Sequence, residues 1–257
     1  MLAQQRQALI VERVRRLGAV RVADLTEMLE VSDMTVRRDL EALAARGLVE
    51  KVHGGATAVV EQSADEPGFA AKVVRQQQEK EAIARRAVTL ITPGAAIGLT
   101  AGTTTWTLAR HLGEVPDITV VTNSVPVADL LHASRGPHTV ILTGGLRTPS
   151  DGLVGPVADA AIRSLHVDLL FMGVHGMDAQ RGFTTPNLTE AQTNREWVRA
   201  SRRLVVLADH TKAGTVGLAS MATLDEADVL VTDDLVDDAF AQVLDEHVSE
   251  LMLVSAG

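Results

Sequence analysis

The chain has 257 residues and a net charge of −9 with neutral histidines, and 46% of its residues are hydrophobic while only 2% are aromatic. This composition excludes general disorder and leaves room for one large domain or two, and the scarcity of rings argues against a nucleic-acid surface built from stacked aromatic side chains. The absence of cysteine excludes disulfides, cysteine-ligated metal sites and thiol nucleophiles.

The sequence has no apolar run of about 18 residues, which a membrane-spanning helix would need. Its first residues also lack the apolar core and cleavage site of a signal peptide. We therefore expect a soluble, cytoplasmic protein with no membrane partner.

Charge divides the chain into two parts. Residues 1–58 hold 9 basic and 8 acidic residues, and the rest holds 15 basic and 25 acidic residues. Any contact with nucleic acid should therefore come from the first part. Turn-forming and charged residues without periodicity fill residues 57–68. We expect a first domain at residues 1–57, a linker at 58–74 and a second domain at 75–257.

The first domain begins with a pattern typical of three helices. Apolar residues at helical spacing predict a first helix that ends at Gly18. A second short helix covers residues 22–29. Ser32 is a good N-cap for a third helix, in which apolar residues between positions 36 and 43 face inward. Two short helices joined by such a tight turn form a helix-turn-helix.

A hairpin is expected after the third helix, which Gly47 ends. Residues 48–52 predict a strand, two glycines after His53 permit a sharp tip, and residues 57–60 predict the return strand. The first domain is therefore expected to be a winged helix-turn-helix.

The third helix would enter the major groove of DNA. Thr35, Arg37 and Arg38 lie near its outward N-terminal side, where they would meet bases and phosphates. Lys51 and His53 of the wing would lie along the backbone. The alternative is a small helical module for protein contacts, with both arginines merely solvated.

The run VSDMTVRRDLEALAARGLVEKVHGGA at residues 31–56 resembles the N-terminal signature of the DeoR family of bacterial transcriptional regulators. The resemblance implies that residues 32–43 form the recognition helix with its cap and that residues 53–55 belong to the wing. The residues expected at the DNA are Ser32, Thr35, Arg37, Arg38, Lys51, His53 and Gly54.

The second domain alternates apolar strands with amphipathic helices. This pattern predicts a doubly wound α/β domain with a mostly parallel sheet that is covered on both faces. The strands are expected at residues 95–99, 118–122, 139–143, 167–174, 204–208, 227–232 and 250–254. The helices are expected at residues 79–91, 105–112, 125–133, 157–164, 189–200 and 236–246.

Small and polar residues follow the carboxyl ends of these strands, which is where such sheets bind ligands. The run TAGTTT at residues 100–105 opens directly into a helix, so that its backbone and hydroxyl groups can hold an anion. A mobile lysine and a carboxylate on the same rim would suit a phosphorylated polyol. Each cluster also has a plain structural interpretation, as a helix cap, a turn or a solvated side chain.

The same resemblance covers the second domain through TAGTTT, VVTNS, LTGG, GVHGMD, the spacing of Glu190 and Arg195, and ADHTK. It implies an effector domain related in fold to sugar-phosphate isomerases, with a phosphorylated sugar as effector. Many family members carry an acidic residue where this chain has Thr100, so the resemblance implies an effector that differs from theirs. The residues expected at the effector are Thr100, Gly102, Thr103, Thr104, Asn123, Gly144, Gly145, Gly176, Asp178, Glu190 and Lys212.

The eight histidines show no metal-binding spacing, and no serine has the context of a nucleophile, so we assign no metal, cofactor or catalytic residue. The leading hypothesis is a cytoplasmic transcriptional regulator that represses carbohydrate-metabolism genes. A phosphorylated sugar would release it from DNA or modulate its binding. The regulator would act as a homo-oligomer, dimer or tetramer, on double-stranded operator DNA.

Two alternatives stay open at this point. One is a sugar-phosphate isomerase-like enzyme or hydrolase with an appended assembly domain, in which Asp178, Glu190, Asp209 and Lys212 supply acid and base. The other is a constitutive DNA-binding protein whose pocket has no ligand.

Overall fold

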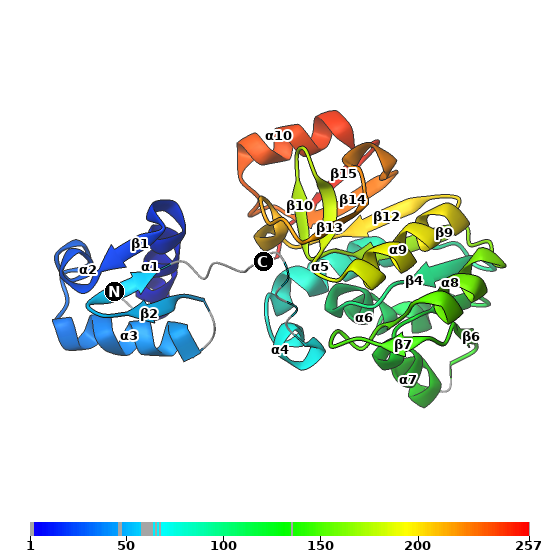
Figure 1. The fold of residues 1–257 in the computed structure, drawn as a ribbon, viewed down its shortest axis with the longest axis horizontal. Coiled ribbons are helices and arrows are strands. Elements are labelled where there is room, and N and C mark those ends of the chain that lie inside the picture. The colour runs from blue at the N-terminus through cyan, green and yellow to red at the C-terminus, as the bar shows by residue number, and fades with distance from the viewer. Residues whose placement is uncertain are drawn as a thin grey trace. The chain divides into compact units, whose positions relative to one another are not determined.

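The computed structural model describes residues 3–45, 48–57, 64, 66, 68–134 and 136–256 (Figure 1). The chain divides into two compact units, Met1–Glu61 and Gln62–Gly257, which we call the head and the sheet domain. The predicted domain boundaries, with a first domain at residues 1–57, a linker at 58–74 and a second domain at 75–257, stay a prediction. Gly47 and residues 58–60, predicted as a helix end and a return strand, lie outside the described residues.

In its described part, the head packs three helices against a small antiparallel sheet with the strand order β1-β3-β2. Buried Ile10, Val14, Leu25, Leu29 and Leu40 stack at helical spacing to form its core. The predicted winged helix-turn-helix is confirmed. Strand β1 was not predicted, because three residues between two helices show no alternation. The elements are α1 (Ala3–Leu17), β1 (Ala19–Arg21), α2 (Val22–Leu29), α3 (Asp33–Ala45), β2 (Glu50–Val52) and β3 (Gly55–Thr57).

The sheet domain is built on a seven-stranded sheet in the order β15-β14-β12-β9-β4-β5-β6, with every neighbouring pair parallel. All seven predicted strands belong to it. Their continuous apolar runs are typical of strands that are covered on both faces. The strands are β4 (Ala96–Leu99), β5 (Thr119–Thr122), β6 (Thr139–Leu142), β9 (Leu169–Gly173), β12 (Leu204–Leu207), β14 (Val229–Asp233) and β15 (Leu251–Val254).

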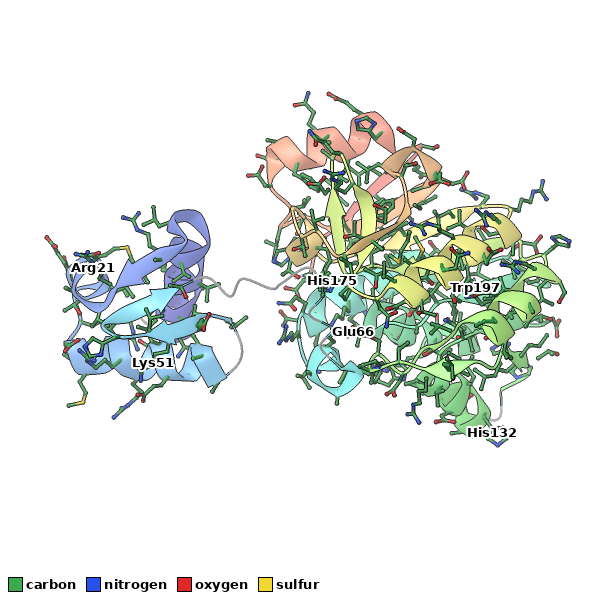
Figure 2. All side chains as sticks on the ribbon, viewed as in Figure 1. Arg21, Lys51, Glu66, His132, His175 and Trp197 are labelled. Carbon is green, nitrogen blue, oxygen red and sulfur yellow. The ribbon has the colours of Figure 1, made fainter. Side chains whose placement is uncertain are left out.

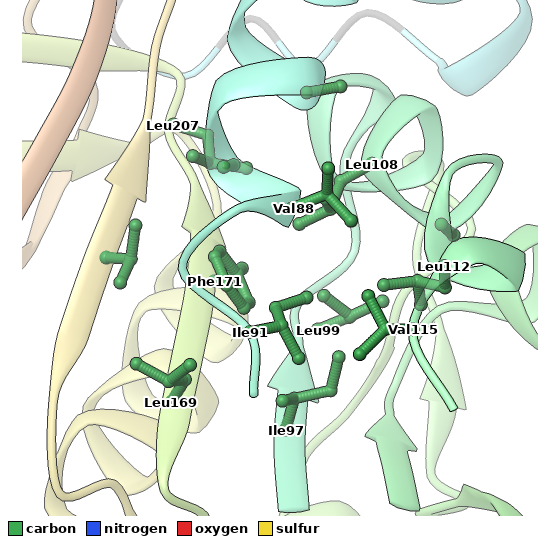
Figure 3. Packing of buried hydrophobic residues seen from close by; sticks show 14 of the residues in the cluster. Val88, Ile91, Ile97, Leu99, Leu108, Leu112, Val115, Leu169, Phe171 and Leu207 are labelled. Atoms are coloured by element: carbon green, nitrogen blue, oxygen red, sulfur yellow. The ribbon is translucent and has the colours of Figure 1, made fainter. Parts of the chain in front are cut away.

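Helices cover both faces of this sheet, as expected for a doubly wound fold (Figure 1). Along each strand, alternate side chains enter the two cores, so that Phe171 and Leu207 pack on one face (Figure 3) while Leu170 and Met172 pack on the other. Helices α5 (Gln77–Val88), α6 (Thr103–Ala109) and α7 (Val125–Ser134) lie on the first face, and α8 (Pro156–Arg163), α9 (Leu188–Ala200) and α10 (Asp238–His247) lie on the second.

The strand order reverses between β4 and β9. The chain lays down β4, β5 and β6 in one direction, and then returns to lay down β9, β12, β14 and β15 in the other. The loops that follow β4 and β9 therefore diverge and leave a crevice, which is the usual ligand position in doubly wound folds.

Several short elements were not predicted, because their two to five residues are too few for a periodic pattern. They are α4 (Phe69–Val73), the hairpin of β7 (Leu146–Arg147) and β8 (Leu153–Val154), the antiparallel sheet of β10 (Gly176–Asp178), β11 (Gly182–Thr185) and β13 (Ala219–Ala222), and the short helices η1 (Leu112–Glu114), η2 (His210–Lys212) and η3 (Leu224–Glu226). Helix α4 lies within residues 58–74, the predicted linker. Among the described residues, no helix is long and apolar enough to cross a bilayer.

Candidate functional site

The N-terminus of α3 presents polar and basic side chains to solvent. Ser32 caps the helix, since its Oγ accepts a hydrogen bond from the Thr35 N–H at 3.3 Å and lies 2.8 Å from the Thr35 hydroxyl. Arg37 and Arg38 are exposed, and the Nε of Arg37 lies 3.2 Å from a carboxylate oxygen of Asp33. Because this ion pair is exposed, it is weak and leaves Arg37 available to a phosphate or a base.

A buried carboxylate holds α3 against α1. Asp39 accepts hydrogen bonds from Arg6 and, at 3.0 Å, from the side-chain amide of Gln7. Burial by itself would raise the pKa of Asp39, but the hydrogen bonds from Arg6 and Gln7 hold this pKa below its usual value. The pairing ties α3 to α1 and sets the negative charge of Asp39 against the positive charge of Arg6.

The wing residues form the second part of this surface. Lys51 pairs with Glu41 at 2.7 Å, and His53 is exposed at the tip beside Gly54, whose φ is +79°. A side chain on Gly55 would place its Cβ 2.1 Å from the carbonyl oxygen of Val20 in the neighbouring strand. The two adjacent glycines therefore serve different needs, one a left-handed turn and the other a close approach of two strands.

This difference predicts unequal effects of two neighbouring substitutions. Gly55→Ala should destabilise the head by about 3 kcal/mol or more, because β1 and β3 must separate to admit the methyl group. Gly54→Ala should cost only about 1 to 2 kcal/mol, because its Cβ meets open space and the cost is the left-handed backbone alone. Thermal unfolding of the full chain would measure both, and equal effects of the two substitutions would contradict this account.

In the sheet domain, the loops after β4 and β9 are tied together at the point where the strand order reverses. The Gly173 N–H donates to the buried Thr100 hydroxyl at 3.2 Å, and the Thr105 hydroxyl donates to the Thr100 carbonyl at 2.7 Å. A Cβ on Gly102 would lie 3.2 Å from the Thr105 oxygen. The loop is thus tightly held where α6 begins at Thr103, and the first N–H groups of a helix have no partner within it.

Asn123 holds three loops together. Its Oδ1 accepts from the Ala101 N–H at 3.0 Å, and its Nδ2 donates to the Leu153 carbonyl at 3.0 Å. The Leu153 N–H returns a bond to the Asn123 carbonyl at 2.7 Å. The buried amide therefore links the loops after β4 and β5 to the β7–β8 hairpin.

Three glycines predicted at the effector have packing roles in the structure. Gly144 and Gly145 both have positive φ, and a Cβ on Gly145 would lie 2.7 Å from the Val154 carbonyl oxygen. A Cβ on Gly176 would lie 2.0 Å from the carbonyl oxygen of Thr215. A side chain has no room at Gly145 or Gly176, whereas at Gly144 only the left-handed backbone disfavours one. A role in effector binding stays a prediction for all three.

Asp178 and Lys212 flank two residues that pair with each other, since Met177 and Ala213 form a parallel bridge. Asp178 begins the β10–β11 turn, where its Oδ1 accepts the N–H groups of Gln180 and Arg181, both at 2.9 Å. This is the turn-forming role that a plain structural interpretation gives to this residue. Lys212 ends η2, directly after β12, and is partly buried.

A polar cluster that was not predicted joins the segment before α5 to these loops. The carboxylate of Glu66 (Figure 2) accepts from the Ser150 hydroxyl at 3.0 Å and from the Asn187 amide at 2.9 Å. Lys72 donates to the same Ser150 oxygen at 2.9 Å. Glu66 lies 84 residues from Ser150 and 121 residues from Asn187 in sequence. No local pattern could have indicated either contact.

Glu190, predicted at the effector, lies beside this cluster. Its carboxylate accepts a hydrogen bond from the Thr185 hydroxyl at 3.1 Å, and the residue is partly buried. Burial raises the pKa of Glu190 to about 7, the charge of Lys72 opposes this shift, and the charge of Glu66 adds to it. Near neutral pH the group therefore exists in both protonation states.

A buried lysine anchors the end of α4. The ammonium of Lys80 donates to the carbonyl oxygens of Lys72 at 2.7 Å and Arg75 at 2.5 Å. Burial lowers the pKa of Lys80 to about 8. The negative charge of Asp209 opposes this lowering, and the positive charge of Lys212 contributes to it. These influences place Lys80, Asp209 and Lys212 in one electrostatic neighbourhood at the carboxyl end of β12.

The loop after β12 is fixed by two aspartates. Asp233 accepts from the His210 N–H, and its other oxygen lies 2.7 Å from the His210 Nδ1. Burial alone would lower the pKa of His210, but Asp233 raises it above its usual value. Asp209 caps η2 through one oxygen, and its buried Oδ2 has no hydrogen-bond partner among the described residues. This oxygen is enclosed by protein atoms, so no ligand reaches it without a rearrangement of the loop. No cluster of metal-ligating side chains occurs among the described residues.

Comparison with known families accounts for nearly the whole chain. The DeoR-like helix-turn-helix domain family matches residues 6–62, and the DeoR C terminal sensor domain family matches residues 75–234. The chain belongs to the DeoR family of transcriptional regulators. The predicted membership is thereby confirmed.

Two relatives in the DeoR family and one solved structure illustrate the likeness. The chain is 37% identical to the HTH-type transcriptional regulator GlpR of Haloferax volcanii, over 92% of each chain. It is 31% identical to the HTH-type transcriptional repressor GlcR of Bacillus subtilis, over 98% of this chain and 97% of that one. The structure of ribose 5-phosphate isomerase A of Methanocaldococcus jannaschii aligns with 52% of this chain over 53% of its own length, with 19% sequence identity and a TM-score of 0.38.

Membership of the DeoR family decides between a regulator and an enzyme, and leaves open the alternative of a constitutive DNA-binding protein whose pocket has no ligand. The relatives are named as regulators and repressors, so the prediction of a DNA-binding transcriptional regulator rather than an enzyme is confirmed. The individual residues predicted at the DNA and at the effector stay predictions.

Proposed function

We propose that this chain is a cytoplasmic DeoR-type repressor of carbohydrate-metabolism genes, which binds operator DNA through its head and is released or modulated by a phosphorylated sugar bound at the carboxyl edge of the parallel sheet. One observation carries the effector part of the proposal. The edge at which β4 and β9 diverge gathers a tight Gly–Thr loop, carboxylates and lysines from separate stretches of the chain.

Each chemical group of a sugar phosphate has a counterpart at this edge. The N–H and hydroxyl groups from Gly102 to Thr104 suit a phosphate, which accepts hydrogen bonds and is favoured by the start of a helix. Lys212 adds positive charge. Glu190 suits the hydroxyl groups of the sugar, which donate hydrogen bonds.

Operator recognition requires more than one head. A single winged helix covers a small stretch of DNA, and repressors of this type bind paired half-sites with symmetric oligomers. We therefore include a homo-oligomer, dimer or tetramer, in the proposal. Sedimentation equilibrium of the full chain would distinguish these from a monomer.

A thermal-shift panel of sugar phosphates and the matching free sugars tests the proposed effector. A ligand at 100 times its dissociation constant adds about 2.7 kcal/mol, which raises the melting temperature of a domain this size by about 5 to 10 °C. We expect such a shift with a phosphate ester, but neither with its free sugar nor in the Thr103→Glu variant. No shift with any phosphate ester would contradict the effector part of the proposal and leave DNA binding by the head unaffected.

A further inference from the structure

We call the described residues between Glu66 and Arg75 the strap. The strap belongs to the sheet domain, and in sequence it directly follows the residues that connect the head to the sheet domain. The Phe69 N–H donates to the Pro149 carbonyl at 3.2 Å, and the Phe69 ring meets the Trp106 ring edge-on, with 6.0 Å between centroids. Lys80 holds the carboxyl end of the strap through two carbonyl oxygens. The strap is thus attached along its length to loops at the edge proposed for the effector.

Two carboxylates meet at the strap. Asn187 connects them, because its Oδ1 caps α9 by accepting the Glu190 N–H at 3.1 Å while its Nδ2 donates to Glu66 at 2.9 Å. The Glu66 and Glu190 residues are each partly buried and keep part of their surface exposed. The negative charge of Glu66 disfavours ionisation of Glu190, as expected for two carboxylates that share one site.

Both carboxylates retain capacity to accept hydrogen bonds. An ionised carboxylate has about four acceptor positions. Among the described residues, Glu66 accepts from Ser150 and Asn187, and Glu190 accepts from Thr185. Two acceptors side by side fit the adjacent hydroxyl groups of a polyol, each of which donates one hydrogen. Lys72 nearby limits the negative charge of the pair.

We propose that Glu66 and Glu190 together bind adjacent hydroxyl groups of the effector. The inference rests on the proposed sugar-phosphate effector and assigns its hydroxyl groups to this pair. Because Glu66 lies in the strap, and the strap directly follows the residues that lead from the head, the hydroxyl groups of the effector act on the sheet-domain end of the connection between the two units, and the phosphate alone does not.

The test compares the affinity of the full chain for a sugar phosphate with its affinity for inorganic phosphate. We use a panel of pentose and hexose phosphates as probes, and the variants Glu66→Gln and Glu190→Gln, which keep side-chain size and remove the charged acceptor. Each variant should weaken binding of the best sugar phosphate about tenfold or more and leave binding of inorganic phosphate within about twofold. Glu246→Gln, an exposed glutamate on α10, is the matched control and should change neither affinity.

The outcomes separate this inference from the proposed function. If the wild-type chain binds a sugar phosphate and both variants bind it equally well, the carboxylate pair is wrong and the proposed effector class stands. If the wild-type chain binds no sugar phosphate, the proposed effector and the pair are both wrong. Glu66→Asp, which retains the charge on a shorter side chain, should fall between wild type and Glu66→Gln, and equality with Glu66→Gln would show that the charge itself has no role.

A second measurement addresses regulation. The DNA duplex is selected for binding to the wild-type chain, and its affinity is measured without ligand and at saturating sugar phosphate. The change in DNA affinity that the ligand causes should be at least about threefold smaller in Glu66→Gln than in wild type. DNA affinity without ligand should be unchanged, because Glu66 lies outside the head. A full response in the saturated variant would overturn the role of the strap.

Discussion

Replacing Arg37 and Arg38 together by alanine is expected to weaken binding to a selected operator duplex on the order of a hundredfold at moderate salt. A side chain that reads a base contributes about 1 to 3 kcal/mol, and each phosphate contact adds about 0.9 to the slope of log affinity against log salt. The double variant should therefore also lose about one to two from this slope. Fluorescence anisotropy titrations across a salt series would measure both quantities.

The double variant should fold normally. Both side chains are exposed, and the ion pair of Arg37 with Asp33 is a surface contact of little energetic value. Arg85→Ala on α5 removes an exposed positive charge, which is also paired with a glutamate, from the sheet domain and serves as the control. Unchanged affinity and unchanged salt slope in the double variant would show that α3 does not enter the groove with this face.

Sequence patterns predicted the parts of this protein that local chemistry determines. The central strands β9 and β12 are continuous apolar runs, because both of their faces are buried. The position of the candidate site followed from the same pattern, since the loops after parallel strands meet at one edge. The cap at Ser32 was visible because capping depends on residues three apart.

Contacts between distant parts of the chain could not be predicted in this way. Glu66 lies in a stretch without periodicity, and its partners Ser150 and Asn187 become neighbours only when the sheet has formed. Asp178 was expected near the effector because of its position after a strand, whereas the structure gives its Oδ1 two turn amides. Composition alone does not distinguish a carboxylate that binds a ligand from one that closes a turn.

Glu190→Gln is expected to stabilise the sheet domain, and to do so more strongly at high pH. The pKa of Glu190 is about 7 in the folded chain and 4.5 in the unfolded chain, so folding is favoured while the group is protonated. This contribution is fully present below pH 4.5 and is lost as the pH rises through 7, because the buried group must then ionise. Glutamine stays neutral throughout. The gain from Glu190→Gln should be on the order of 2 to 3 kcal/mol larger at pH 8 than at pH 5.

A second glutamate on the same helix should behave in the opposite way. Hydrogen bonds from Arg163, at 3.0 and 3.1 Å, lower the pKa of Glu196 below its usual value despite desolvation, and Arg199 adds to this shift. Its contribution to stability is therefore present above pH 4.5 and is lost only in more acidic solution. Glu196→Gln should destabilise the domain equally at pH 5 and pH 8, whereas Glu190→Gln should stabilise it mainly at pH 8. Urea denaturation of both variants at the two pH values measures this contrast, and a pH-independent effect of Glu190→Gln would show that Glu190 ionises freely in the folded chain.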